Sequence, residues 1–325
     1  FYENLSLLID MIESPYFTDE NVEKEKGIIG QELDMYSNDP EQAMFNKLYY
    51  NSIINNPLRY DIGGTKEEVN KITKEDLYEC YNTFYNPSNM SLFIAGDIDV
   101  TKVIEFIKEK ESKRSISKLD NIVKKEYEEP LSVLKKEEVI YHNVTKTKIG
   151  YAYKIILPKD KKEREFIRKF YIKVFLSTRF GSTTGFSEKL IKDGLSNSYF
   201  YYDYSFTDNI AMIFFTGDIT DDLKVQKLIE DRLKDLTNLD TMFNLYKRNF
   251  ISSYVKSFES MDNVINNLRS MVNNYGVIFD NLYDLYSNSS FEDYLNTIKS
   301  LDFSNKTKVI VRNKEDKDAR SKGSN

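Results

Sequence analysis

Hydrophobic residues in the first part of the chain recur at spacings of three and four, which is the period of an amphipathic helix. Together with capping residues and helix breakers, this pattern predicts a series of helices interrupted by one strand. The predicted helices cover residues 1–12, 18–36, 40–54, 73–84 and 100–111, and the strand covers residues 90–95, just before Gly96 and Asp97.

The second half mixes apolar runs typical of strands with longer segments of helical period. Strands are predicted at residues 137–144, 148–156, 199–206, 211–217 and 308–312. Helices are predicted at residues 161–180, 187–193, 221–236, 240–258 and 261–274. Residues 112–133 lack a strong period and contain Pro130, which is typical of a linker, and the Lys/Glu run at 108–129 is predicted to be solvated.

One arrangement occurs twice. Residues 89–107 and 209–229 each place a strand, a Gly-Asp-Ile turn and a helix in the same order. This similarity is compatible with two copies of one α+β domain. Because a strand, a Gly-Asp turn and a helix often follow one another, a chance similarity stays open.

Composition limits the possible functions. The chain has 325 residues, and at roughly 150 residues per domain this length predicts two domains. It has 46 Lys plus Arg against 52 Asp plus Glu, so its net charge of −6 disfavours nucleic-acid binding. A single cysteine excludes a disulfide framework, and a single histidine excludes a two-histidine metal motif built from this chain alone.

Neither a membrane nor an export signal is predicted. The longest apolar runs are far shorter than the ~18 residues of a spanning helix, and no basic segment followed by an apolar one begins the chain. We therefore expect a cytoplasmic protein. The chain begins at Phe1 rather than Met, which indicates processing or a piece of a longer chain.

The helix predicted at 18–36 carries the candidate chemistry. Val22, Glu25, Ile29, Glu32 and Tyr36 form one continuous stripe along it. The two carboxylates are seven residues apart, so they lie on one face about 10 Å from each other. On an apolar stripe such carboxylates need a partner or a metal, because an unpaired buried charge is unfavourable. A solvated helix with pairs four residues apart would produce much the same pattern.

Two glycines lie within the same predicted helix. Gly27 and Gly30 each cost about 1 kcal/mol relative to alanine in a helix interior. Their presence suggests that another element approaches this helix closely.

These segments resemble the pitrilysin/insulinase family of zinc metallopeptidases. The segment SPYFTDENVEKEKGIIGQELDMYSNDP is similar to the family's helix after the zinc motif. DIGGTKEEVNKITKEDLYECYNTFYNPSNMSLFIAGDID resembles the family's downstream helix–loop–strand passage, and FGSTTGFSEKLIKDGL resembles a loop and helix of its C-terminal domain. The resemblance extends over residues 1–313 and is most specific between residues 23 and 97. Within the family, the sequence is most similar to bacterial cytoplasmic processing-peptidase-like members.

The resemblance implies roles for both carboxylates. In the family, two histidines of an H-x-x-E-H helix and a downstream glutamate hold zinc. That glutamate corresponds to Glu32, which makes Glu32 the implied metal ligand, and the supporting glutamate one heptad earlier corresponds to Glu25. Zinc held in this way lowers the pKa of a bound water and polarises the scissile carbonyl.

The sequence departs from the family at two places. H-x-x-E-H is absent, and the only histidine, His142, lies in a predicted strand of the second half. The family order would put the motif before Phe1, so the first domain is expected to be truncated. In addition, residues 190–197 lack the Arg and Tyr with which many members contact substrate.

The resemblance implies an α+β fold of two tandem related domains, each an antiparallel sheet with helices packed on one face, the first domain being incomplete. Residues 1–115 would be the C-terminal part of the first domain, 116–135 a linker, 136–313 the second domain and 314–325 a disordered tail. The expected function is part of a zinc-dependent metalloendopeptidase acting on peptides or a small protein. Zinc is expected in the complete protein and not in this chain alone.

Two alternatives stay open. The first is a non-catalytic peptidase-fold subunit or scaffold that binds a partner protein. The second is a helical interaction protein without a site, which would expose Glu25 and Glu32 fully. The expected partners are a peptide or small-protein substrate and a second copy or a paired family subunit, without nucleic acid or membrane. The incomplete first domain would expose apolar surface and favour dimerisation.

Overall fold

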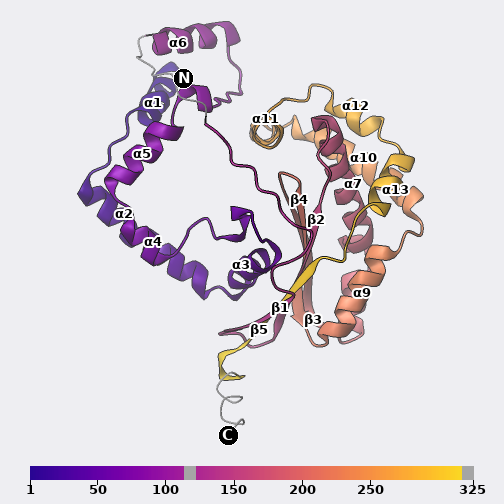
Figure 1. The fold of residues 1–325 in the computed structure, drawn as a ribbon. Coiled ribbons are helices and arrows are strands. Elements are labelled where there is room, and N and C mark those ends of the chain that lie inside the picture. Colours follow the sequence, from indigo (N-terminus) through magenta and orange to yellow (C-terminus); the bar gives the residue numbers. More distant parts are fainter. Residues whose placement is uncertain (113–121, 317–325) are drawn as a thin grey trace. The chain divides into compact units, whose positions relative to one another are not determined.

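The computed structural model describes residues 1–112 and 122–316. These residues form two compact units (Figure 1). The first comprises residues 1–35, 63–126 and 260–269, and the second comprises residues 36–62, 127–259 and 270–325. The predicted linker and tail fall partly outside the described residues, at 113–121 and 317–325.

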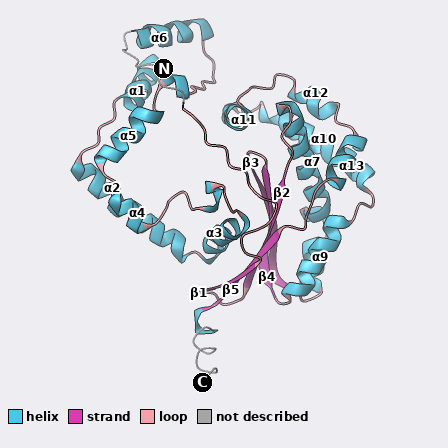
Figure 2. Cartoon of the chain, in the orientation of Figure 1, coloured by secondary structure: helices cyan, strands magenta, loops and turns pink. Residues whose placement is uncertain are grey.

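The second unit is built on a five-stranded sheet with the strand order β1-β5-β2-β4-β3 (Figure 2). The strands are β1 (Glu137–His142), β2 (Lys148–Ile156), β3 (Ser196–Thr207), β4 (Ile210–Ile219) and β5 (Lys306–Asn313). β2 pairs antiparallel with β4 and with β5, and β3 pairs antiparallel with β4. β1 and β5 are parallel, so the sheet is mixed where a wholly antiparallel sheet was expected.

Strand alternation divides the sheet into two apolar faces. Tyr151 on β2 and Phe215 on β4 are paired and belong to the larger core, together with residues of α7 (Lys162–Phe180). Ala152 and Phe214 point to the opposite face, where a smaller core forms with α3 (Pro40–Ser52). Helices therefore cover both faces of this sheet rather than the one face predicted.

α3 packs closely against the sheet. A Cβ atom at Gly150 on β2 would lie 2.8 Å from Leu48 Cδ1 and 3.0 Å from Met44 Sδ, so only glycine permits this approach. The rings of Phe45 and Tyr49 pack on Phe214 at centroid distances of 5.5 and 5.0 Å. α3 thus belongs to the same compact unit as the strands, although it precedes them by some eighty residues of sequence.

The other helices of this unit lie on the face of α7 or connect the strands, except η1, which follows α3 and packs beside it. They are η1 (Pro57–Arg59), η3 (Ser182–Thr184), α8 (Phe186–Lys192), α9 (Asp222–Lys234), α10 (Leu239–Ser257), α12 (Leu282–Ser287) and α13 (Phe291–Lys299). α11 (Met261–Tyr275) begins in the first unit and ends in the second.

The described part of the first unit is helical. It contains α1 (Tyr2–Glu13), most of α2 (Asp19–Asn38), α4 (Lys66–Lys71), α5 (Lys74–Phe84), η2 (Pro87–Asn89) and α6 (Val100–Ser112). Its core is small: Leu5, Ile9 and Val103 are buried, with Ile94 and Phe106 among the partly buried residues packed against them.

The predicted strand at residues 90–95 does not form. These residues have no regular structure in the described chain. A strand is defined by hydrogen bonds to a neighbouring strand, and the described residues of this unit contain no other strand to supply them. The α+β class itself is confirmed, whereas a relation between the two halves stays a prediction.

Candidate functional site

α2 places the two candidate carboxylates on one exposed helix face. The helix starts after Thr18, whose Oγ1 accepts a hydrogen bond from the Asn21 amide at 3.1 Å. Acidic residues in its first turn, Asp19 and Glu20, suit the positive end of the helix dipole. Lys74 on α5 binds Asp19 at 2.7 Å and links the two helices.

The predicted stripe on α2 is less buried in the structure than its apolar residues suggested. Val22 is buried and Ile29 is half-buried, but Glu25 and Glu32 are both exposed. Exposure means that burial does not force either carboxylate to find a partner, which removes that part of the sequence argument. Their roles as zinc ligand and supporting residue stay predictions.

The predicted close approach at the helix glycines is absent from the described residues. A Cβ atom at Gly27 would have no neighbour within 4 Å. At Gly30 the nearest atom is Lys66 Cε at 3.9 Å, an ordinary van der Waals distance. Lys66 forms an ion pair with Asp34, and Lys26 Nζ on α2 donates to the Asn70 carbonyl of α4 at 3.2 Å, so the two helices contact each other through these long polar side chains.

The described residues do not by themselves fit zinc. A catalytic zinc site needs three protein ligands and an open position. No group of three or more His, Cys, Asp or Glu side chains in the described chain could hold a metal. His142 lies at the end of β1 in the other unit, where its Nε2 donates to the Ser37 carbonyl at 3.0 Å and its Nδ1 is buried. Glu32 can therefore supply one ligand of a set that the described residues do not complete.

The segment without the family's Arg and Tyr forms a turn between a short helix and a strand. α8 ends at Lys192, and Gly194 has a φ of 69°, which favours glycine. Lys189 binds Asp193 at 2.7 Å, and this hydrogen bond lowers the pKa of the Asp193 carboxyl. In the following strand Tyr202 packs on the larger core, whereas Tyr201 is exposed.

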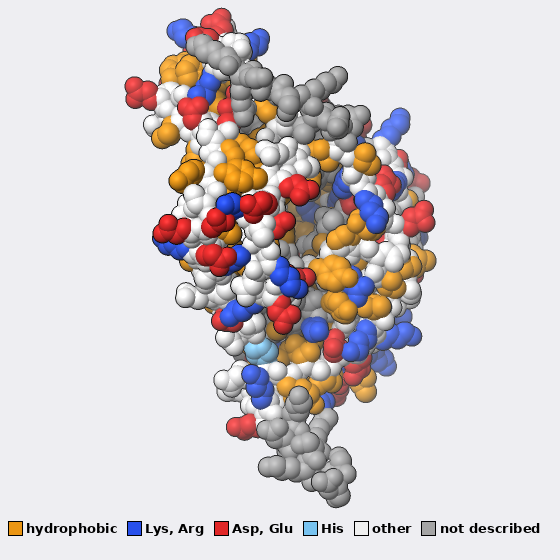
Figure 3. Space-filling model, turned by 60° about the vertical axis from the view of Figure 1, so that its left-hand side comes forward, with side chains coloured by type: hydrophobic (Ala, Val, Ile, Leu, Met, Phe, Trp, Pro, Cys, Tyr) orange, Lys and Arg blue, Asp and Glu red, His pale blue; other side chains and the backbone are white. Residues whose placement is uncertain are grey.

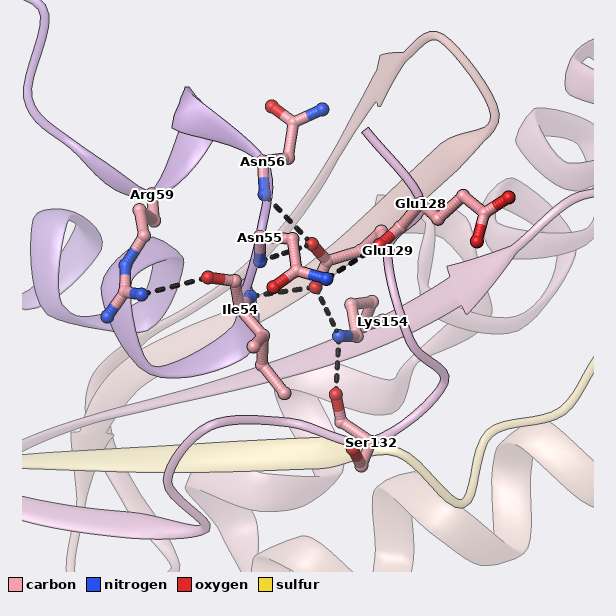
Figure 4. A network of polar contacts seen from close by, with 8 residues as sticks. All are labelled: Ile54, Asn55, Asn56, Arg59, Glu128, Glu129, Ser132 and Lys154. Carbon is pink, nitrogen blue, oxygen red and sulfur yellow. Dashed lines mark hydrogen bonds and ion pairs between the residues drawn. The ribbon is translucent and has the colours of Figure 1, made fainter. Parts of the chain in front are cut away.

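A buried charged network was missed by the sequence analysis (Figure 4). Glu129, within the predicted solvated linker, has a side chain only 1 % exposed. Its carboxylate accepts hydrogen bonds from Lys154 Nζ at 2.8 Å and from the amides of Ile54, Asn55 and Asn56 at 2.7–3.0 Å. Although burial alone would raise it, these donors together lower the pKa of Glu129.

The network joins three distant segments of the chain. Lys154 on β2 also donates to the Ser132 carbonyl at 2.5 Å, so the sheet, the loop after α3 and residues 129–132 share one set of contacts. In the sequence, Glu129 belongs to a run of charged residues that does not distinguish it from its exposed neighbours. Only the fold identifies its role.

Acidic and basic side chains are interspersed on the surface drawn in Figure 3. No helix among the described residues is long and apolar enough to cross a membrane.

Comparison with known proteins identifies the class of this fold. Residues 71–180 match the family described as "Peptidase M16 inactive domain". The chain is similar to the "Crystal structure of putative M16-like peptidase from Alicyclobacillus acidocaldarius", with a TM-score of 0.85 and 24% identity over 96% of this chain and 75% of that chain.

Curated relatives agree with this class. The chain is 32% identical over 265 residues to "Uncharacterized zinc protease YmfH" of Bacillus subtilis, which covers 81% of this chain and 62% of the relative. It is 26% identical over 160 residues to "Probable inactive metalloprotease YmfF" of the same organism, covering 47% of this chain and 37% of the relative. It is also 26% identical over 103 residues to "Mitochondrial-processing peptidase subunit beta" of Caenorhabditis elegans, covering 32% of this chain and 22% of the relative.

The chain belongs to the M16 family of peptidase-like proteins, the pitrilysin/insulinase family, which confirms the predicted resemblance. It spans less than two thirds of the length of the curated relatives it matches. Of these three relatives, one is named as a zinc protease, one as a probable inactive metalloprotease and one as a subunit of a processing peptidase.

Proposed function

We propose that this chain is part of a zinc-dependent metalloendopeptidase that hydrolyses peptides or a small protein. Glu32 would be the third zinc ligand, Glu25 would support it, and the histidine ligands would lie outside this chain. The observation that carries the proposal is the 32% identity to a protein named as a zinc protease over 81% of this chain.

The geometry of α2 is compatible with these roles. Both carboxylates are exposed, as the alternative without a site also predicts, and ligands from another segment could reach them. Their seven-residue spacing places them on one face about 10 Å apart, which suits one direct ligand and one supporting group rather than two ligands of one ion.

The proposal also assigns each part of the chain to one of two domains of the complete protein. Residues 1–115 would be the C-terminal part of the catalytic domain, and residues 136–313 would be the second, C-terminal domain. The match to the inactive domain of the family covers residues 71–180, and its part within residues 136–180 supports a non-catalytic role for the second domain.

Peptide hydrolysis by the full-length protein tests the proposal. The protein should cleave a fluorogenic peptide library in a reaction that stops with a zinc chelator and resumes with added zinc. Glu32→Gln should reduce kcat/KM by more than about 100-fold, because a ligand is lost. Glu25→Gln should reduce it by roughly 10- to 100-fold, as expected for a residue that supports a ligand.

Glu23 offers a matched control on the same helix. It lies about 180° around α2 from Glu32, since nine residues at 100° each make two and a half turns. Its side chain is 70% exposed and pairs with Lys26. Glu23→Gln removes the same charge and should leave kcat/KM within about twofold. Equal losses in all three variants would indicate a damaged helix rather than a ligand.

A second candidate function is a non-catalytic subunit that binds a partner protein. The relative named as a probable inactive metalloprotease and the missing Arg and Tyr at residues 190–197 favour it. A full-length protein with no chelator-sensitive hydrolysis of any library peptide would support this candidate over the first.

A further inference from the structure

Two lysines on α7 lie in unusual surroundings for charged residues. Lys169 and Lys173 are one helical turn apart, so their side chains point the same way. Lys169 is 9% exposed, and Lys173 is half-buried. No carboxylate oxygen of a described residue lies within 4.0 Å of either ammonium group.

Two aromatic rings lie near each of the two ammonium groups. Lys169 Nζ lies 4.9 Å from the ring centroid of Tyr275 and 5.8 Å from that of Phe206. Lys173 Nζ lies 5.6 Å from the centroid of Tyr204 and 5.9 Å from that of Phe206. Both cations therefore share the ring of Phe206, on β3 at the edge of the sheet.

The nearby acidic groups do not neutralise this pair. Glu165, one turn before Lys169, accepts hydrogen bonds from Lys162 Nζ at 3.2 Å and from the Asp160 amide at 3.1 Å. Asp208, in the turn after β3, is exposed, and the charges of Glu165 and Asp208 raise the pKa of Lys169 without an ion pair to its ammonium group. Asp203 is also exposed, and it alternates with Tyr204 along β3, so it points to the opposite face of the sheet.

Burial and mutual repulsion disfavour the two positive charges. Burial is the main cause that lowers the pKa of both lysines, and the charge of Lys169 lowers that of Lys173 further. A ring face compensates only part of the hydration that an ammonium group loses on burial. The cluster thus holds two donors with an excess of positive charge.

Further donors lie at the same place. The hydroxyl groups of Tyr204 and Tyr275 have no hydrogen-bond acceptor among the described residues. Ammonium and phenol groups without an acceptor, beside apolar ring faces, are complementary to an oxyanion attached to an apolar or aromatic group.

We propose that Lys169, Lys173, Tyr204, Phe206 and Tyr275 form a binding site for such an oxyanion, either the C-terminal carboxylate of a peptide or a phosphoryl group. The oxyanion would bridge the two ammonium groups, and the rings would pack on the apolar part of the ligand. The site uses only residues of the second unit and does not depend on Glu32 or on peptidase activity.

Calorimetric titration of the full-length protein at constant ionic strength tests the site with three probes. The probes are inorganic phosphate, an N-acetylated tripeptide ending in Phe with a free carboxylate, and the same tripeptide as its C-terminal amide. Saturable binding of the free-carboxylate peptide identifies a peptide ligand, and binding of phosphate alone identifies a phosphoryl ligand. The amide should not bind.

Matched variants locate the binding. Lys169→Gln and Lys173→Gln should each weaken binding at least about tenfold. Lys227→Gln removes the same charge from the exposed surface of α9 and should leave the affinity unchanged within twofold. Equal weakening in all three variants would mean general electrostatic attraction and would overturn the proposal.

A measurement on the unaltered protein avoids dependence on the folding of the variants. Lysine acylation by a small anhydride, read by mass spectrometry, should slow at least threefold at Lys169 and Lys173 when the binding probe is present. Lys227 should react at the same rate with and without the probe. Absence of saturable binding for both anionic probes, or no protection of either lysine, would refute the site.

Discussion

At the scale of residues, Glu129 shows how a charge can hold distant segments together. Its carboxylate is almost completely buried and accepts four hydrogen bonds, one from Lys154 and three from the backbone after α3. The desolvation of such a charge is unfavourable unless every partner is in place. Removing one partner leaves the other charge buried without compensation. The loss of stability is therefore larger than the net stabilisation that the intact pair provides.

Glu129→Gln should lower the free energy of unfolding by roughly 3 kcal/mol, because Lys154 would remain buried without its counter-charge. The neighbouring Glu128 is exposed, so Glu128→Gln should change the unfolding free energy by less than about 0.5 kcal/mol. Urea unfolding of the two variants measures both values. Similar small changes in both would show that the network contributes little.

The same carboxylate predicts a pH dependence. The pKa of Glu129 is lower in the folded protein than its ordinary value of 4.5. Its contribution to stability is therefore complete above about pH 4.5 and is lost as the pH falls through the lower folded-state pKa. Between pH 5 and 3 the unfolding free energy of the unaltered protein should fall more steeply than that of Glu129→Gln, and parallel curves would contradict the assignment.

At the scale of elements, local patterns predicted most helices and the strands of the second unit. α3 was predicted at residues 40–54 and found at residues 40–52, since Asp39 and Pro40 mark its start in the sequence. The failures share one cause. The parallel pairing of β1 with β5, the docking of α3 on the sheet and the missing strand at 90–95 all depend on partners distant in sequence or outside the described residues.

Gly150 lies in tight packing and Gly27 in open space, so replacing each by alanine should have opposite effects on stability. Gly150→Ala should destabilise the protein by about 1–3 kcal/mol, because its Cβ would overlap the buried side chains of Leu48 and Met44 and force them to shift. Gly27→Ala should stabilise α2 by about 0.5–1 kcal/mol in this chain, since nothing lies within 4 Å. Thermal unfolding distinguishes the two, and a tolerated Gly150→Ala would refute the close packing of α3.

At the scale of the whole molecule, the family could be recognised from the sequence, but the candidate site could not be completed. Glu25 and Glu32 were identified by their spacing and by resemblance, and α2 places both on one exposed face. Their roles depend on ligands that the described residues do not supply, so neither periodicity nor this fold can test them. Conversely, Glu129 and the Lys169–Lys173 cluster became visible only once distant segments were brought together.

The claim that Glu32 is a zinc ligand is tested most directly by the zinc content of the full-length protein and of its Glu32→Gln variant. Elemental analysis of the purified protein should find about one zinc per chain. Glu32→Gln should lose most of it, whereas Glu23→Gln should retain it. If the full-length protein binds no zinc, or if the Glu32→Gln variant binds as much zinc as the unaltered protein, Glu32 is not a ligand. Either result would favour a peptidase fold kept for binding.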